Sequence, residues 1–129
     1  VSALNFVGTG DDVLIVGFVI NGNVPKKLLI RGVGPALAAF NVADLLADPT
    51  LEIFRDGTSI AVTDNWGDEP NAAEIAATAA AVSAFALPAG GRDAALVLTL
   101  PAGNYSYSAK VSGLANTSGV ALVEIYEVP

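Results

Sequence analysis

The chain contains no cysteine, no histidine and no methionine. The absence of cysteine excludes disulfides and thiol nucleophiles, and the absence of both cysteine and histidine excludes Cys/His zinc sites. Without histidine, the chain also lacks the side chain that most often transfers protons in catalysis. No nucleophile motif is present, so we predict that the protein is not an enzyme and assign it no catalytic residues. The one catalytic alternative is a pair of carboxylates, such as Asp64 and Asp68, acting as acid and base.

Basic residues are also scarce. Six lysines and arginines stand against thirteen acidic residues, which gives a formal net charge of −7 at pH 7. Such a chain repels phosphate groups, and no stripe of basic residues compensates for this repulsion. We therefore expect neither nucleic acid nor an anionic lipid surface as a partner.

Long hydrophobic runs are missing as well. The longest, from Val13 to Ile20, is interrupted by Gly17 and is far shorter than the roughly 18 residues of a membrane-spanning helix. No transmembrane segment is therefore expected. Yet 53% of the residues are hydrophobic and the mean hydropathy is +0.56. This surplus indicates strands covered on both faces, or a surface that packs against another protein.

The turn residues divide the first half of the chain into short strands within one domain, residues 1–129. Residues 13–20 form a run typical of a central strand, and residues 27–31 follow closely enough for a hairpin. Asp56 and Gly57 separate two further strands, residues 51–55 and 58–63, and are the strongest hairpin signal in the chain.

The second half of the chain adds three strands, at residues 94–100, 104–112 and 119–128. In the middle one, polar and apolar residues alternate, with Tyr105, Tyr107, Ala109 and Val111 on one face. Such alternation is typical of a strand with one solvated face. Seven or eight strands with turn residues between them predict an all-β fold, an antiparallel β-sandwich resembling a jelly roll.

One convincing helix is expected, at residues 72–81, lying over one end or edge of the sheets. Asn71 is placed to cap it, and Glu74 is spaced to complete a capping box. Ile75 and Ala79 start an apolar stripe at helical spacing. A single additional helical turn is expected near residues 42–46.

Acidic and amide side chains gather in the loop just before this helix. Asp64, Asn65, Asp68 and Glu69 supply the oxygen ligands that Ca²⁺ prefers, and Gly67 permits a tight turn. Calcium is therefore the one possible cofactor. The alternative is structural: Asp64 and Asn65 form an Asx turn, and the two later carboxylates favour the helix N-terminus.

The only tryptophan, Trp66, lies in the same loop. An exposed aromatic ring beside amides suits carbohydrate, so Trp66 and Asn65, together with Tyr105 and Tyr107, are candidate ligand-binding residues. The alternative places Trp66 over the open end of the core, because buried tryptophan is the commoner case, and the two tyrosines in or beside the core.

Two arginines are placed to form ion pairs with carboxylates. Arg31 ends one apolar strand and Arg92 precedes another, and Asp48 or Asp93 is a plausible partner for them. An anion site at the Gly32–Gly34 loop is only weakly indicated, because Pro35 removes a backbone donor.

Several separate motifs follow one another in a fixed order along the chain. They are residues 6–15 (FVGTGDDVLI), 28–37 (LLIRGVGPAL), 47–52 (ADPTLE), 64–66 (DNW), 92–96 (RDAAL), 100–105 (LPAGNY) and 119–126 (GVALVEIY). This order resembles a module found, often repeated, in large predicted secreted or surface proteins of environmental bacteria, and the resemblance covers nearly the whole chain. The second half is also similar, more loosely, to the sandwich domains appended to secreted peptidases.

This resemblance implies a location outside the cell, secreted or at the cell surface, and a multidomain protein, but no activity. We therefore expect a non-catalytic structural or adhesion module, either a repeat of a surface protein or a subunit of a surface assembly. Its partners would be other protein domains or copies of itself, with residues 1–7 free to add to a neighbouring sheet as a donor strand. The alternative is a carbohydrate-binding module that uses Trp66 to bind polysaccharide, possibly with a structural calcium.

Overall fold

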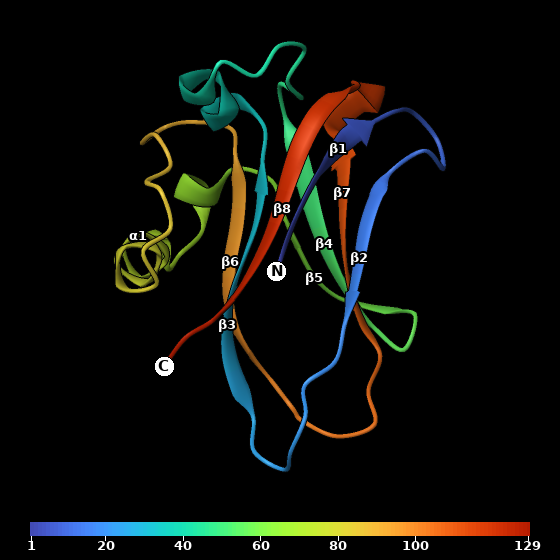
Figure 1. The fold of residues 1–129 in the computed structure, drawn as a ribbon, viewed down its shortest axis with the longest axis vertical. Helices are drawn as coiled ribbons and strands as arrows, with labels where there is room; N and C mark the ends of the chain where they lie inside the picture. The colour runs from blue at the N-terminus through green and yellow to red at the C-terminus, as the bar shows by residue number, and fades with distance from the viewer.

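Eight strands form two antiparallel four-stranded sheets in the computed structural model, which describes residues Val1–Pro129 (Figure 1). Sheet A contains, in order, β1 (Ser2–Val7), β8 (Gly119–Glu127), β3 (Lys26–Val33) and β6 (Ala94–Leu100). Sheet B contains β2 (Leu14–Phe18), β7 (Tyr107–Gly113), β4 (Pro49–Arg55) and β5 (Thr58–Thr63). The predicted all-β sandwich is confirmed, and this strand order is that of a jelly roll.

The predicted hairpin of the first two long strands is wrong. β2 pairs with β7 in sheet B, whereas β3 pairs with β6 and β8 in sheet A. β2 is also an edge strand rather than a central one, and its Ile15 side chain is largely exposed. A continuous apolar run indicates burial on both faces, but the run carries no information about the distant strand with which it pairs.

The strand that is covered on both faces is β3. Leu28 and Ile30 point into the core between the two sheets, whereas Leu29 belongs to a second apolar cluster on the outer face of sheet A. Every residue from Leu28 to Val33 is buried. Sheet A is therefore the middle layer of three, which accounts for the high hydrophobic fraction of the chain.

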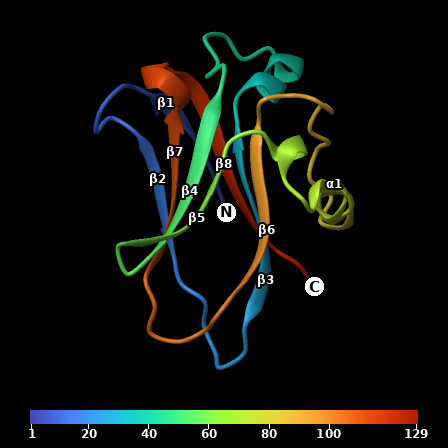
Figure 2. The same ribbon diagram turned by 180° about the vertical axis from the view of Figure 1, so that it is seen from behind.

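The third layer is formed by residues 64–93, between β5 and β6. This segment contains the 3-10 turn η2 (Trp66–Asp68) and the helix α1 (Ala72–Ala81), with the bounds predicted for the helix. Figures 1 and 2 show α1 on the side of sheet A that faces away from sheet B, so it covers a sheet face rather than an end or edge. Ile75 and Ala79 pack there against sheet A, with Leu29 and Ala95.

The start of α1 differs from the prediction. The side chain of Asn71 makes no capping hydrogen bond to the backbone. Its Nδ2 instead donates to Oε1 of Glu74 at 3.2 Å, so the two side chains pair with each other rather than forming a capping box.

The short helical segment near the top of the fold lies earlier than predicted, at η1 (Pro35–Phe40) rather than at residues 42–46. Oδ1 of the buried Asp93 accepts hydrogen bonds from the backbone N–H groups of Gly34, at 2.9 Å, and Ala36, at 3.1 Å. These bonds fix the first turn. Asn41 then takes the left-handed conformation, with φ 59°, and ends the segment. A third 3-10 turn, η3 (Leu114–Asn116), joins β7 to β8.

The β4–β5 hairpin is confirmed. Asp56 and Gly57 both have positive φ angles, 50° and 81°, as the predicted two-residue turn requires. Leu51 and Ile53 point into the core, whereas Glu52 points outwards. The alternation predicted for residues 104–112 is found only from Tyr107 onwards, where β7 begins, so Tyr105 lies before the strand. The outer face of sheet B carries the polar residues of β7, but also the exposed Ile15 and Val62.

The helices of this fold are short. No helix of the structure is both long enough and apolar enough to cross a membrane.

Gly34 occupies a position where any side chain would collide with the backbone. A Cβ atom there would overlap the carbonyl oxygen of Leu46. We expect Gly34→Ala to lower the free energy of unfolding by about 1–3 kcal/mol, because the neighbouring backbone must shift. The matched control is Gly67→Ala, whose Cβ would meet no atom within 4 Å. Urea unfolding of both variants tests this, and equal stability of the two would contradict the backbone contact.

Candidate functional site

Trp66 lies in the protein interior, not on an open surface. The residue is 8% exposed and packs with Ile75 and Ala79 between α1 and sheet A. Its Nε1 donates a hydrogen bond to the carbonyl oxygen of Pro88 at 3.2 Å. Its backbone N–H donates to the carbonyl oxygen of Asp93. The ring therefore fastens the third layer to β6. It presents no open face on which a sugar ring could stack.

The four proposed calcium ligands lie around one surface hollow. Asn65 and Asp68 are joined by a hydrogen bond of 3.4 Å, and both line a shallow surface hollow together with Asp64 and Glu69. No three acidic side chains anywhere in the structure come close enough to share a metal ion. The loop is thus held by contacts within itself and by the buried indole of Trp66.

The carboxyl group of Asp64 lies beside that of Asp48. Burial, a hydrogen bond to the Asp48 carboxyl and the charge of Asp48 together raise the pKa of Asp64 from its usual 3.8 to about 6. Arg92, whose Nη1 lies 3.9 Å from Oδ2 of Asp48, opposes this shift. Arg92 thus has Asp48 as its partner, one of the two predicted, but its side chain is exposed rather than buried or half-buried. The two carboxyl groups can therefore hold one proton between them at mildly acidic pH.

The two tyrosines lie at the other end of the sandwich from the acidic loop. Tyr107 on β7 lies opposite Arg55, the last residue of β4 before the β4–β5 turn. Asp64 follows the last residue of β5, at the end of that strand far from the turn. Tyr107 is buried, and its hydroxyl donates to the carbonyl oxygen of Pro101 at 2.6 Å. Tyr105 is more exposed, with its ring 6.0 Å from that of Tyr107. The residues proposed for carbohydrate thus fall into two separate places.

A buried ion pair links the two central strands of sheet A. Nε and Nη2 of Arg31 both donate to Oε1 of Glu124, at 2.9 and 2.7 Å, from directly opposite positions on β3 and β8. Asp48 and Asp93 were the predicted partners of Arg31, and this prediction is wrong, because the partner is Glu124. Asp93 instead accepts the N–H of Gly34, so the Gly32–Gly34 loop binds an internal carboxylate rather than an external anion.

The ion pair also holds other parts of the chain. Nη1 of Arg31 donates to the carbonyl oxygen of Phe85 at 2.6 Å, and the guanidinium lies 4.3 Å from the centre of the Phe85 ring. The hydroxyl of Tyr126 donates to Oε2 of Glu124 at 2.5 Å. Burial, this hydrogen bond and the Glu124 charge raise the pKa of Tyr126 to about 12. The network thus ties the segment after α1 to sheet A.

The edges of the two sheets carry an unusual distribution of charge, which the sequence reading missed. β1, β2, β5 and β6 are the edge strands, and none of them contains a charged residue or a proline. Every charged residue within a strand lies on the four inner strands. Monomeric β proteins usually protect free edges with charges, prolines or bulges, so these edges lack the common devices against strand pairing.

The two sides of the sandwich differ in how their edge strands are protected against pairing with another strand. β5 has a bulge where its register with β4 shifts, and η2 and α1 contact β6. β1 pairs with β8, and β2 pairs with β7, each in continuous register and without a bulge. The two edge strands β1 and β2 lie in contact with each other on one side of the sandwich. We call this side the β1–β2 flank. Its two strands expose Leu4 (56%), Phe6 (53%) and Ile15 (58%), and Val1 (78%) and Val19 (63%) are exposed just outside them.

On sheet A the exposed side chains of the β1–β2 flank adjoin a further apolar cluster. Leu4 lies opposite Leu122, and Phe6 lies opposite Val120, so each pair shares one face of the sheet. The two β8 residues are partly buried against the cluster of Val33, Ala36 and Leu37, whereas Leu4 and Phe6 are exposed. α1 packs over β3 and β6 and does not reach this surface (Figure 1). The flank therefore combines two strand edges without a partner strand with exposed apolar side chains, although one edge N–H, that of Phe6, donates to Oδ1 of Asn5 at 2.8 Å.

Comparison of the chain with models of protein families, with curated proteins and with solved structures found no match.

The raised pKa of Asp64 makes stability depend on pH. Between about pH 4 and 6 Asp64 binds more protons in the folded protein than in the unfolded chain, so its contribution to stability falls as the pH rises through this window. We expect Asp64→Asn to raise the free energy of unfolding at pH 7.5 by about 1 kcal/mol. This gain is smaller than the full pKa shift would give, because solvent screens the partly exposed side chain. This gain should disappear near pH 4.

The control for Asp64→Asn is Asp11→Asn, which makes the same change in an exposed turn. Urea unfolding at both pH values is the measurement. A gain of the same size in Asp11→Asn would show that the general negative charge, rather than the Asp48 contact, is responsible.

Removing one partner of the buried ion pair should be costly. We expect Glu124→Gln to lower the free energy of unfolding by about 3–5 kcal/mol, because the buried Arg31 charge loses its counter-ion. The matched control is Glu74→Gln, in the exposed Lys27–Glu74 pair, whose Nζ–Oε2 distance is 3.0 Å. That variant should show no measurable change. Thermal and urea unfolding provide the comparison, and equal effects in the two variants would contradict the structural role of Glu124.

Proposed function

We propose that this chain is a non-catalytic structural module that associates with further copies of itself through the β1–β2 flank. The observation that carries the proposal is the absence of charge, proline and bulge from β1 and β2, where apolar side chains are also exposed. A strand of a second copy placed beside β1 would find free edge backbone and the exposed Leu4 and Phe6 together, and one placed beside β2 would find free edge backbone and the exposed Ile15.

The mode of association differs from donor-strand exchange. Residues 1–7 are not free, because β1 is hydrogen-bonded to β8 over its whole length. The N-terminal amine also donates to the carbonyl oxygen of Ile125. In the proposed assembly β1 keeps its own partner and gains a second one, so each copy remains a complete sandwich. Two copies related by a two-fold axis would present the same flank to each other.

The setting of this module is proposed from the sequence. Its resemblance to repeated modules of secreted and surface proteins supports a place outside the cell, in a larger assembly or in a protein with several such modules. The interior position of Trp66 weighs against the carbohydrate-binding alternative, because the ring has no open face.

Self-association can be measured by sedimentation equilibrium over a concentration series. We expect the unmodified chain to associate, and Ile15→Lys and Leu4→Lys to weaken association by about tenfold or more, because each places a charge beside a free strand edge. The control is Val24→Lys, at a residue that is 56% exposed, much as Ile15 is, but lies outside the strands.

The outcomes of that experiment separate clearly. A chain that stays monomeric at millimolar concentration would contradict self-association. Weakening of association by Val24→Lys as large as that by Ile15→Lys would show that lysine acts through general charge, and would remove the β1–β2 flank from the proposal.

The net charge of −7 gives a further expectation. Two copies repel each other at long range, and salt screens this repulsion, with a Debye length that falls from about 30 Å at 0.01 M to about 8 Å at 0.15 M ionic strength. Association through an uncharged flank should therefore become stronger as salt is added. Sedimentation at these two ionic strengths tests this, and weaker association in salt would indicate contacts between opposite charges instead.

A further inference from the structure

Two hydrogen bonds between Val1 and Ile125 determine which backbone groups of β1 are open. The amine of Val1 donates to the carbonyl oxygen of Ile125 at 3.0 Å, and the N–H of Ile125 donates to the carbonyl oxygen of Val1 at 2.8 Å. In an antiparallel pair, such mutually bonded residues alternate with residues whose backbone groups point away from the partner strand. The odd-numbered residues of β1 therefore bond to β8, whereas Ser2, Leu4 and Phe6 direct their N–H and C=O groups towards the open edge.

The hydrogen bond of the Phe6 N–H agrees with this assignment. It donates to Oδ1 of Asn5 at 2.8 Å, and it is available to this side chain because it does not bond to β8. The amide oxygen of Asn5 thus occupies the position that a carbonyl oxygen of an added strand would take. Asn5 is exposed, so its side chain can exchange this bond for bonds to water at little cost.

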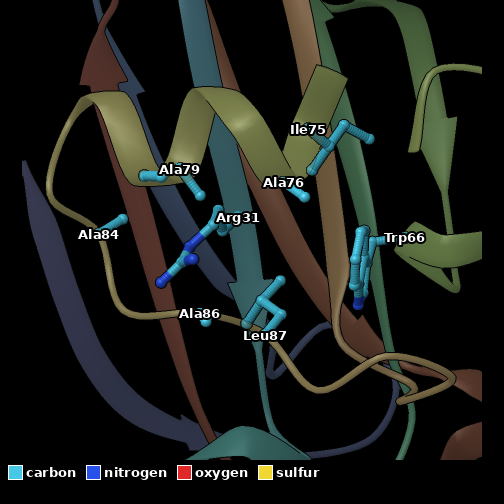
Figure 3. Close-up of a pocket in the computed structure, with 9 residues that line it drawn as sticks. Arg31, Trp66, Ile75, Ala76, Ala79, Ala84, Ala86 and Leu87 are labelled. Carbon is cyan, nitrogen blue, oxygen red and sulfur yellow. The ribbon is translucent and has the colours of Figure 1, made fainter. Parts of the chain in front are cut away.

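The opposite edge of sheet A is less accessible than β1. α1 and η2 contact β6, and the hollow between the helix and the sheet is lined by residues that include Trp66, Ile75 and Leu87 (Figure 3). An added strand at that edge would lie beside this third layer. At β1, by contrast, no helix covers the sheet, so a second copy can approach its edge (Figure 1).

The open residues of β1 are arranged symmetrically about Leu4, which makes the strand complementary to a second β1. In an antiparallel pair with a two-fold axis at Leu4, the two Leu4 residues lie opposite each other, and Ser2 lies opposite Phe6 of the second copy. Three such pairs, with two bonds each, satisfy every open N–H and C=O group of Ser2, Leu4 and Phe6. An axis at Ala3 or Asn5 would pair only two of these three residues within β1. The Leu4 side chains, which are 56% exposed, would also contact each other across the axis.

We propose that two copies of the chain join β1 to β1 in this register, with Leu4 on the two-fold axis, and that Asn5 opposes the pairing by holding the Phe6 N–H. This inference rests on the self-association proposed above and assigns it to one strand and one register. The two A sheets become one continuous sheet. In each copy the Asn5 side chain leaves the Phe6 N–H before the terminal pair with Ser2 of the other copy forms.

The absence of cysteine from the chain allows a direct test of the register. In the proposed dimer the two Leu4 Cα atoms lie about 5.5 Å apart, within the range that a disulfide bridges. At a concentration where the unmodified chain associates, Leu4→Cys should therefore form linked dimers under mild oxidation. The control is Val24→Cys, because Val24 is also 56% exposed but lies outside the strands. It should link only slowly, by random collision.

Two further cysteine variants distinguish this register from its neighbours. Ala3→Cys alone should not link, because in the proposed register Ala3 lies diagonally across from its copy, at roughly 7–8 Å. A mixture of Ala3→Cys and Asn5→Cys chains should link, because these two residues lie opposite each other. The mixture also shows that a cysteine at position 3 is accessible to the oxidant.

The role of Asn5 is tested by sedimentation equilibrium. We expect Asn5→Ala to strengthen association by about tenfold, because the dimer no longer requires two hydrogen bonds to Asn5 to be broken. The control is Asn23→Ala, which makes the same change in the exposed loop between β2 and β3. That variant should associate as the unmodified chain does.

The failure of this inference and the failure of the proposed function give different results. An unmodified chain that stays monomeric would overturn both. Association without rapid linkage of Leu4→Cys, or with equal linkage of Val24→Cys, would overturn the β1–β1 pairing and leave self-association standing. Linkage of Ala3→Cys alone would overturn the register. Association that is unchanged or weaker in Asn5→Ala would overturn the role of Asn5.

Discussion

The outer half of this fold depends on the ion pair between Arg31 and Glu124. Both residues lie on inner strands of sheet A and point away from the core between the sheets. A charge at this position is stable only with a counter-ion and further hydrogen bonds. Phe85 supplies one of these bonds through its carbonyl oxygen and covers the guanidinium with its ring. The segment after α1 is therefore positioned by electrostatics as well as by apolar packing.

This arrangement divides the surface of sheet A into two unlike parts. Over β3 and β6, the helix and its following segment bury apolar residues around Trp66. Over β1, the apolar side chains of Leu4 and Phe6 are exposed. An exposed apolar surface of this kind is typical of an interaction site. The buried part and the exposed part belong to one sheet, and only the cover differs.

Local features of the sequence predicted the parts of the structure that local forces determine. Residues 72–81 have helical spacing and alanine content, and Asp56–Gly57 have the backbone freedom that a tight turn requires, so both predictions are confirmed. The partner of Arg31 is 93 residues away, and the neighbour of β2 in the sheet is β7. No local pattern encodes such pairings. The edge position of β2 was missed for the same reason, because its apolar run resembles that of a central strand.

The pairing of the first and last strands has a mechanical consequence. β1 runs antiparallel to β8, and Val1 lies beside Ile125, with two backbone hydrogen bonds between them. Residues 1 and 129 therefore leave this strand pair at the same end. A tensile load applied between them breaks the β1–β8 hydrogen bonds one after another, from Val1 towards Val7. The domain unzips under force rather than resisting in shear, and β1 peels away first while the Arg31–Glu124 pair, between β8 and β3, still holds the rest of sheet A together.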